Sequence, residues 1–204
     1  MLLRSVVWLA GAAIGGARGK SYSRRTGQWK SSTQSRRLTG RLTFILAGPA
    51  DARALAALRG AAARELTRQY GEGHWSSEPS ERGVVADLRH AEVWIARRGA
   101  AAVGTFRLAT KKPWAIDRSY FTDCKRPIYL TNMAVRPDYQ RRGIGRSCLE
   151  HAIRRVREWP ADAIRLDAYD ADAGAGGFYG NCGFREVGRV NYRGTPLVYY
   201  ELLL

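Results

Sequence analysis

The chain has 204 residues, of which 34 are Lys or Arg and 18 are Asp or Glu, so its formal net charge is +16. This length predicts one domain with a short appendage. The balance of 45% apolar and 25% charged residues is that of an ordinary globular protein, and no apolar run reaches the ~18 residues that would span a bilayer. Its three cysteines form no CxxC pair, which disfavours a disulfide framework and a zinc knuckle, so we expect a cytoplasmic protein without a metal.

The first forty residues carry half of the charge excess. They hold eight basic residues and no acid, and beyond about residue 15 they are rich in Gly, Ser and Arg. This composition predicts a disordered basic extension, 1–40, ahead of a folded domain, 41–204. An excess of base suits nucleic acid, a membrane surface or an anionic ligand. We expect neither a specific nucleic acid nor a membrane as partner, because a basic run is usually only solvated.

In chain order, the folded part alternates strand-like and helix-like segments. Alternating apolar residues predict a strand at 41–47, and helical spacing of Ala and Leu predicts a helix from Pro49 to about Tyr70. After a Gly-rich break at 71–75, the predicted elements are a helix around 80–89, a hairpin of strands 92–97 and 101–110, a loop 111–127, a strand 128–135, a helix 143–159, a strand 163–169, a helix 172–180 and strands 184–190 and 196–203. This order predicts an α/β fold, with a mixed sheet covered by helices on its faces.

A glycine-containing loop joins the strand 128–135 to the helix that follows it. A helix N-terminus directs unpaired backbone N–H groups and the positive end of its dipole at the space before it, which favours phosphate. Glycines in such a loop let the backbone approach a ligand closely, and neighbouring arginines add cationic charge for the same anion. On these grounds alone, a surface turn with solvated arginines remains an alternative.

Two motifs together resemble a known family. The spacing Gln140-x-x-Gly143-x-Gly145 resembles the acyl-CoA pyrophosphate loop of the GNAT N-acetyltransferase superfamily and differs from the dinucleotide fingerprint GxGxxG. Further on, residues 172–184 (Asp-x-x-Ala-x-x-Phe-Tyr-x-x-Cys-Gly-Phe) resemble the second signature of that family, with Asp172 where Asn is usual. The resemblance covers roughly 41–204. It implies a GNAT fold, whose mixed and mostly antiparallel sheet has about six to seven strands with a splayed central pair and about four flanking helices.

The resemblance also implies acetyl-CoA as the acyl donor, with no metal. The backbone N–H of Met133 would stabilise the developing oxyanion. Tyr179 matches the tyrosine that commonly protonates the leaving thiolate, a task that suits a phenol with an ordinary pKa of about 10; a merely packed aromatic is the alternative. The implied donor-binding residues are Met133, Ala134, Val135, Gln140, Arg141, Arg142, Gly143, Ile144, Gly145, Arg146, Asp172, Phe178 and Tyr179.

The sequence offers several candidates for the general base. An alkyl ammonium has an ordinary pKa near 10.4, so an acceptor amine must lose a proton before it attacks. Asp167 stands where ribosomal-protein alanine N-acetyltransferases, to which this stretch is similar, carry an acid. With Asp170 and Asp172 it would form an acidic cluster that attracts a cationic amine. A solvated acid at the strand edge is the alternative.

The loop 71–80 holds rival candidates, because this loop often borders the acceptor site in the family. Glu72 and His74 are alternative bases, and Trp75 would stack on an acceptor or a cation. Two residues on the strand before the glycine loop, Thr131 and Asn132, are candidates to line the acceptor cleft, since alternate strand residues face opposite sides. The cysteines at 148 and 182 fall at packing positions, which disfavours an acyl-cysteine route.

These observations lead to one principal hypothesis. We expect an N-acetyltransferase, a monomer or homodimer, that moves an acetyl group from acetyl-CoA to a primary amine by direct attack in a ternary complex. The acceptor would be a small-molecule amine or a protein amino group. Two rivals are a non-catalytic acyl-CoA-binding or sensing module of the same fold, and a nucleic-acid-associated protein that uses the basic extension.

Overall fold

The computed structural model describes residues 21–23, 28–30 and 41–204. The last range forms a seven-stranded sheet in the order β3-β4-β5-β6-β7-β9-β8. Its strands are β3 (Leu42–Leu46), β4 (Glu92–Arg98), β5 (Ala101–Ala109), β6 (Pro127–Val135), β7 (Ala163–Tyr169), β8 (Arg185–Tyr192) and β9 (Thr195–Leu203). Only the β6–β7 pair is parallel within this described sheet. The expected mixed, mostly antiparallel sheet is confirmed.

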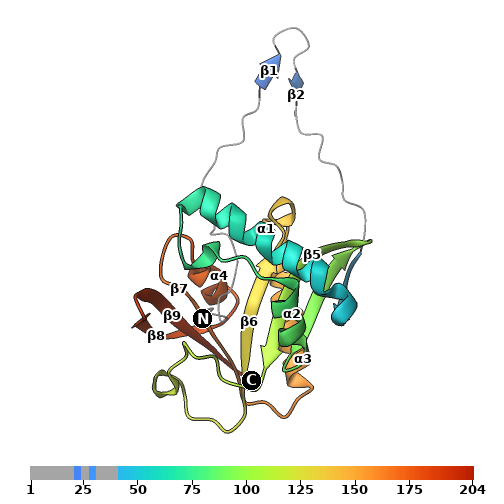
Figure 1. Ribbon diagram of the computed structural model, residues 1–204. Coiled ribbons are helices and arrows are strands. Elements are labelled where there is room, and N and C mark those ends of the chain that lie inside the picture. The colour runs from blue at the N-terminus through green and yellow to red at the C-terminus, as the bar shows by residue number, and fades with distance from the viewer. Residues whose placement is uncertain (1–20, 24–27, 31–40) are drawn as a thin grey trace.

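Helices cover both faces of the sheet, with α1 and α2 on one face and α3 on the other (Figure 1). The α-helices of the described residues are α1 (Ala52–Tyr70), α2 (Glu81–Leu88), α3 (Ile144–Arg157) and α4 (Gly176–Gly180). Short 3₁₀ helices are η1 (Pro49–Asp51), η2 (His74–Ser76), η3 (Arg118–Tyr120) and η4 (Pro137–Tyr139). Their order along the chain agrees with the predicted order of elements.

The predicted helix 172–180 is wrong at its start, since α4 begins only at Gly176. A tight turn precedes it, in which the Gly174 N–H donates to Ala171 O at 2.7 Å. A Cβ at Gly174 would lie 1.9 Å from Tyr169 O. The chain therefore folds back onto the end of β7 before it becomes helical, and only a glycine permits that approach.

Two short strands, β1 (Ser21–Ser23) and β2 (Gln28–Lys30), pair antiparallel ahead of the domain. The rest of the extension that we predicted to be disordered lies outside the described residues, so that prediction stays a prediction. Among the helices that the structure does describe, none has the length and apolar character needed to cross a membrane.

The central strands β6 and β7 diverge along their length. They pair only at their beginnings, where 127–129 lie beside 163–165. Farther along, β6 keeps β5 as its partner up to Val135, and β7 keeps β9 up to Tyr169. The predicted splayed pair is thus confirmed. Beyond Tyr129 and Arg165, the edges of β6 and β7 face each other without paired residues between them.

Helix α3 packs tightly against the sheet beside the end of β6. Its buried stripe contains the residues expected from the sequence, Ile144, Cys148, Ala152 and Val156, together with Leu149. A Cβ at Gly104 on β5 would lie 2.9 Å from Cys148 Sγ, so a side chain there would push the helix away. This packing fixes where the N-terminus of α3 lies relative to the splayed strands.

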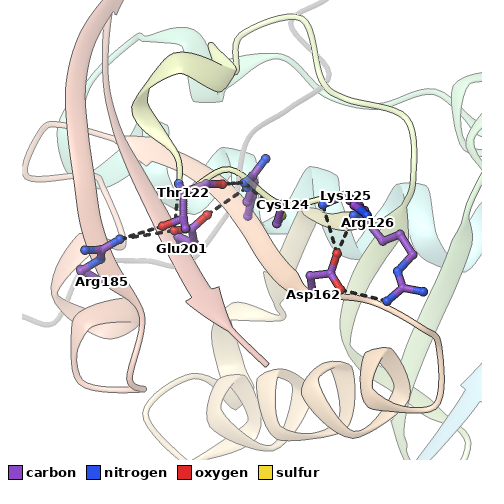
Figure 2. A network of polar contacts seen from close by, with 8 residues as sticks. Thr122, Cys124, Lys125, Arg126, Asp162, Arg185 and Glu201 are labelled. Carbon is purple, nitrogen blue, oxygen red and sulfur yellow. Dashed lines mark hydrogen bonds and ion pairs between the residues drawn. The ribbon is translucent and has the colours of Figure 1, made fainter.

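Polar contacts tie the long loop 110–126 to the start of β7 and the end of β9 (Figure 2). Arg165 and Glu201 form a buried cross-strand ion pair at 3.0 Å. The Arg165 guanidinium donates to Thr122 O, and the Thr122 N–H donates to Glu201 Oε2 at 3.3 Å. Asp162 accepts from the Arg126 N–H at 2.8 Å where the loop re-enters β6. These contacts hold the loop in place over its second half.

Candidate active site

The loop between β6 and α3 presents an array of open backbone donors. Arg141 and Gly143 have positive φ values of 55° and 80°, and together they turn the chain into the helix. Within the described part of the chain, the backbone N–H groups of 141–146 have no hydrogen-bond acceptor, and Ser147 is the first to donate, to Gly143 O at 3.0 Å. Successive N–H groups in such a turn, at the start of a helix, form a concave site for an anion.

Side chains of this loop support the same role. The Gln140 amide donates to Val135 O at 3.0 Å and so braces the loop against the end of β6. The side chains of Arg141, Arg142 and Arg146 are exposed around the open N–H groups. The donor set of backbone N–H groups and guanidinium groups suits a pyrophosphate, a group that coenzyme A contains.

A β-bulge lies in β6 just before this loop. Thr105 of β5 stands opposite Ala134 and Arg107 stands opposite Thr131, so Asn132 and Met133 share one opposing residue. Asn132 has a positive φ of 51°, which is uncommon for a residue other than glycine. The bulge occurs where β6 has already left β7, and it changes the direction of the backbone at Met133.

Asp167 lies on β7 at the divergence of the two strands, and its side chain is 1% exposed. Neither of its carboxylate oxygens has a hydrogen-bond partner in the described residues. Burial raises the pKa of Asp167 to about 7. A buried carboxyl without a partner is costly, and a pKa near neutrality is what a general base requires.

Tyr179 reaches the same region from α4. Its side chain is fully buried, and its hydroxyl donates to Met133 Sδ at 3.7 Å. Burial, and secondarily the charge of Asp167, raise the pKa of Tyr179 well above its ordinary value, so the phenol keeps its proton. Of the three predicted catalytic positions, Tyr179 and Met133 are therefore in contact, and the charge of Asp167 acts on Tyr179. Phe178 packs edge-on against Tyr179, with ring centroids 5.2 Å apart.

Tyr169, which our sequence analysis did not select, belongs to this region. It lies two residues after Asp167, on the same face of β7. Its hydroxyl is buried and has no partner among the described residues, and burial, then the charge of Asp167, raise its pKa. In the sequence, the signal that could have identified Tyr169 was its alternation with Asp167 along the predicted strand. Trp75 packs edge-on against Tyr169, with ring centroids 5.4 Å apart, so this predicted acceptor residue does border the region.

The loop 110–126 meets Trp75 and Tyr169 through Ala115, which shares their apolar cluster. The Tyr199 hydroxyl donates to Ala115 O and accepts from the Asp117 N–H at 3.2 Å. Next to this anchored point, the Trp114 side chain is 78% exposed. An exposed indole on a fixed loop, beside a cluster with a second Trp, is suited to contact a bound molecule.

The other predicted acceptor residues have different surroundings. Glu72 and His74 are exposed, and neither has a hydrogen bond or ion pair within the described ranges. Asp170 is paired with Arg189 at 2.6 Å, and Asp172 is exposed beyond the end of β7. Of the three acids in the predicted cluster, only Asp167 is buried and without a partner.

Neither thiol at a packing position is activated. Burial raises the pKa of Cys148 to about 12 and also raises that of Cys182. Thr131 is buried as well, and its hydroxyl accepts from Arg107 Nη1 at 3.3 Å. In the described ranges, no group of three or more His, Cys, Asp or Glu side chains is placed to hold a metal ion.

Comparison with known proteins agrees with this geometry. A family model described as Acetyltransferase (GNAT) family matches residues 60–184, a range that holds both motifs. A ribosomal protein bS18-alanine N-acetyltransferase from Escherichia coli strain K12 is 40% identical over 67 residues, which are 32% of this chain and 45% of that protein. The chain thus matches less than half the length of this curated relative.

Solved structures show the same fold at low identity. The ribosomal-protein-alanine N-acetyltransferase from Brucella melitensis has a TM-score of 0.63 and 18% identity, over 79% of this chain and 99% of that one. The PaiA N-acetyltransferase from Thermoplasma acidophilum, solved in complex with coenzyme A, has a TM-score of 0.61 and 15% identity, over 80% and 99%. Because the family model spans more than half of its residues, the chain belongs to the acetyltransferase (GNAT) family.

Proposed function

We propose that this protein is an acetyl-CoA-dependent N-acetyltransferase acting on a primary amine. The observation that carries the proposal is the unpartnered Asp167 carboxyl, buried where β6 and β7 diverge, whose charge acts on the protonated Tyr179 phenol. Family membership supports the reaction class.

The donor would be held by backbone groups. The open N–H groups of 141–146 would bind its pyrophosphate. The edge of β6 beyond Tyr129 has no strand partner on the β7 side, so Met133, Ala134 and Val135 would offer backbone hydrogen bonds to the pantetheine arm. In this arrangement the thioester would lie near Met133, whose N–H would stabilise the oxyanion.

The groups at the divergence then have complementary tasks. Asp167 accepts a proton from the acceptor ammonium, and the freed nitrogen forms a bond to the thioester carbon. The C–S bond breaks, Tyr179 donates its proton to the departing sulfur, and the new amide nitrogen loses its second proton to solvent. The products are an amide and a free thiol, with one proton released to solvent for each ammonium consumed. Solvent restores the proton to Tyr179 and removes one from Asp167.

The acceptor is proposed to enter between the loop 71–80 and the loop 110–126, beside Trp75 and Trp114. The curated relatives are named for an alanine amino group of ribosomal protein bS18, so a peptide with an N-terminal alanine is the first acceptor to test. We propose a cytoplasmic setting, a monomeric or homodimeric state, and no metal, since the residues at the divergence supply both the base and the acid.

The experiment is a screen of amines with acetyl-CoA and detection of free thiol. The panel holds peptides with an N-terminal alanine, the same peptides blocked at the N-terminus, lysine peptides, polyamines, aminoglycosides and free amino acids. We expect thiol release with at least one amine, and its loss in Asp167→Asn. Tight binding of acetyl-CoA without thiol release from any amine would instead favour the acyl-CoA-binding module.

A further inference from the structure

A buried polar network lies under α1 and α2, on the far side of β6 from β7. Asp87, on the last turn of α2, is its centre. Arg59 of α1 donates to Asp87 Oδ2 at 3.0 Å, and Arg107 of β5 lies 3.8 Å from Asp87 Oδ1. The Arg59 side chain is 3% exposed and that of Asp87 is 13% exposed. The sequence offered no signal for this network, because its members come from four separate elements.

The network reaches the bulge of β6 through one contact. The Asn132 side-chain amide donates to Asp87 Oδ2 at 3.1 Å. Asn132 is the residue with a φ of 51°, a conformation that an L-residue adopts at a cost unless its surroundings hold it there. The next residue, Met133, supplies the proposed oxyanion donor, and the direction of its peptide N–H depends on the backbone angles of Asn132.

We propose that Asp87 is a positioning residue for acetyl transfer, which acts by holding Asn132 in the bulge that directs the Met133 N–H. The inference rests on the proposed function. Asp87 suits this task because it is itself fixed by Arg59, so the bulge is tied to two helices and not only to its neighbouring strand. The Thr131 hydroxyl, which accepts from Arg107 at 3.3 Å, adds a second tie just before the bulge.

The test compares two matched Asp→Asn variants. In Asp87→Asn, one accepting oxygen replaces two, so Asn132 and the arginines compete for it. In the control, Asp51→Asn, an ion pair of 2.8 Å between the residue that precedes α1 and Arg97 of β4 is weakened. We expect kcat to fall ~10-fold or more in Asp87→Asn, with the KM for acetyl-CoA within about threefold of the wild type, because the loss of an oxyanion donor acts on the transition state. Asp51→Asn should keep kcat within about twofold.

A second variant covers the case in which Asp87→Asn does not fold. Asn132→Gly removes the side-chain amide but tolerates a positive φ, and it should lower kcat in the same way. In the double variant the losses should not add, since both changes break one contact. If Asp87→Asn and Asn132→Gly both keep kcat within about twofold of Asp51→Asn, the positioning role is overturned.

An NMR readout separates this inference from the proposed function. The amide resonance of Met133, recorded without acetyl-CoA, should shift in Asp87→Asn and stay in place in Asp51→Asn. A wild-type chain that acetylates no amine would overturn the function, and the Met133 resonance would then decide alone whether Asp87 holds the bulge. An unchanged resonance would overturn the inference even in an active enzyme.

Discussion

The loop 136–143 and the loop 110–126 border the same divergence of strands but are built in opposite ways. The first is short, and its useful groups are backbone N–H groups set by Gly143 and by the start of α3. The second is long, and its course depends on side chains far away in the sequence, such as Tyr199 and Arg165. The comparison teaches that the proposed donor side is encoded locally, whereas the proposed acceptor side is encoded by tertiary contacts.

The largest effect is expected from a substitution that destroys the proposed donor-binding loop. Gly145→Glu places a carboxylate at the helix N-terminus, where it occupies and repels the pyrophosphate site, so calorimetry should find no measurable binding of acetyl-CoA. Gly145→Gln, with similar size and no charge, should retain more affinity and so separate crowding from repulsion. Unchanged affinity in Gly145→Glu would show that the loop does not bind the donor.

The second largest effect is expected at Asp167, the proposed base between the donor loop and the acceptor loop. Asp167→Asn should lower kcat by ~1000-fold, because the acceptor then keeps its proton. The pKa of Asp167 is raised from 3.8 to about 7, so the folded chain holds a proton that the unfolded chain has lost in this range. Asp167 therefore costs stability that grows from about pH 4 to pH 7, reaching about 4 kcal/mol.

Two pH measurements check this assignment of Asp167. The Tm of Asp167→Asn should exceed that of the wild type by a margin that is small near pH 4 and largest at pH 8. Wild-type kcat/KM should fall as the pH drops through about 7. A variant that keeps its activity, or a Tm margin that does not change with pH, would remove Asp167 from its proposed role.

Tyr179→Phe should have a smaller effect, a loss of ~100-fold in kcat, since water substitutes partly for the lost acid. Affinity for acetyl-CoA should hardly change, because the ring still packs between Phe184 and Tyr200. Equal turnover in a thiol-release assay would assign the phenol to packing alone.

On the acceptor side, Trp114→Ala should raise the KM for the acceptor by ~10-fold, as expected for one lost aromatic contact. Donor affinity and Tm should stay near those of the wild type, because the indole is exposed. Leu203→Ala, which shortens another exposed apolar side chain on β9, is the control. An acceptor KM that does not differ between the two variants would remove Trp114 from the site.

The smallest effect is expected from deletion of residues 1–40. The sheet and its covering helices lie within 41–204, so Tm and acetyl-CoA affinity should remain close to those of the full chain. A large loss of either would mean that the extension contributes to the fold or to the donor site.

The contrast between the two loops also explains what could be predicted from the sequence. The element order and the apolar stripe of α3 follow from periodicity, and the proposed donor loop follows from the resemblance that Gln140, Gly143 and Gly145 carry. The late start of α4 could not be predicted, because it depends on how closely Gly174 approaches Tyr169 O.

The acceptor side was less accessible to sequence reasoning. Glu72 and His74 were candidate bases because their loop often borders the acceptor site in the resembled family, but no spacing pattern shows that they are exposed. The pairing of Asp170 with Arg189 joins residues far apart in the chain. Tyr169 has only its alternation with Asp167 as a signal, and an aromatic residue in a strand usually indicates packing.

The anchored loop 110–126 has a consequence for how the proposed enzyme would choose its acceptor. Because Tyr199, Arg165 and Glu201 already hold its backbone, an arriving acceptor meets a pre-organised surface and does not bear the entropic cost of ordering it. Selection among amines should then depend on shape at the loop tip rather than on induced fit. A substitution at Trp114 could redirect the enzyme to another amine while the anchors, and with them the fold, stay unchanged.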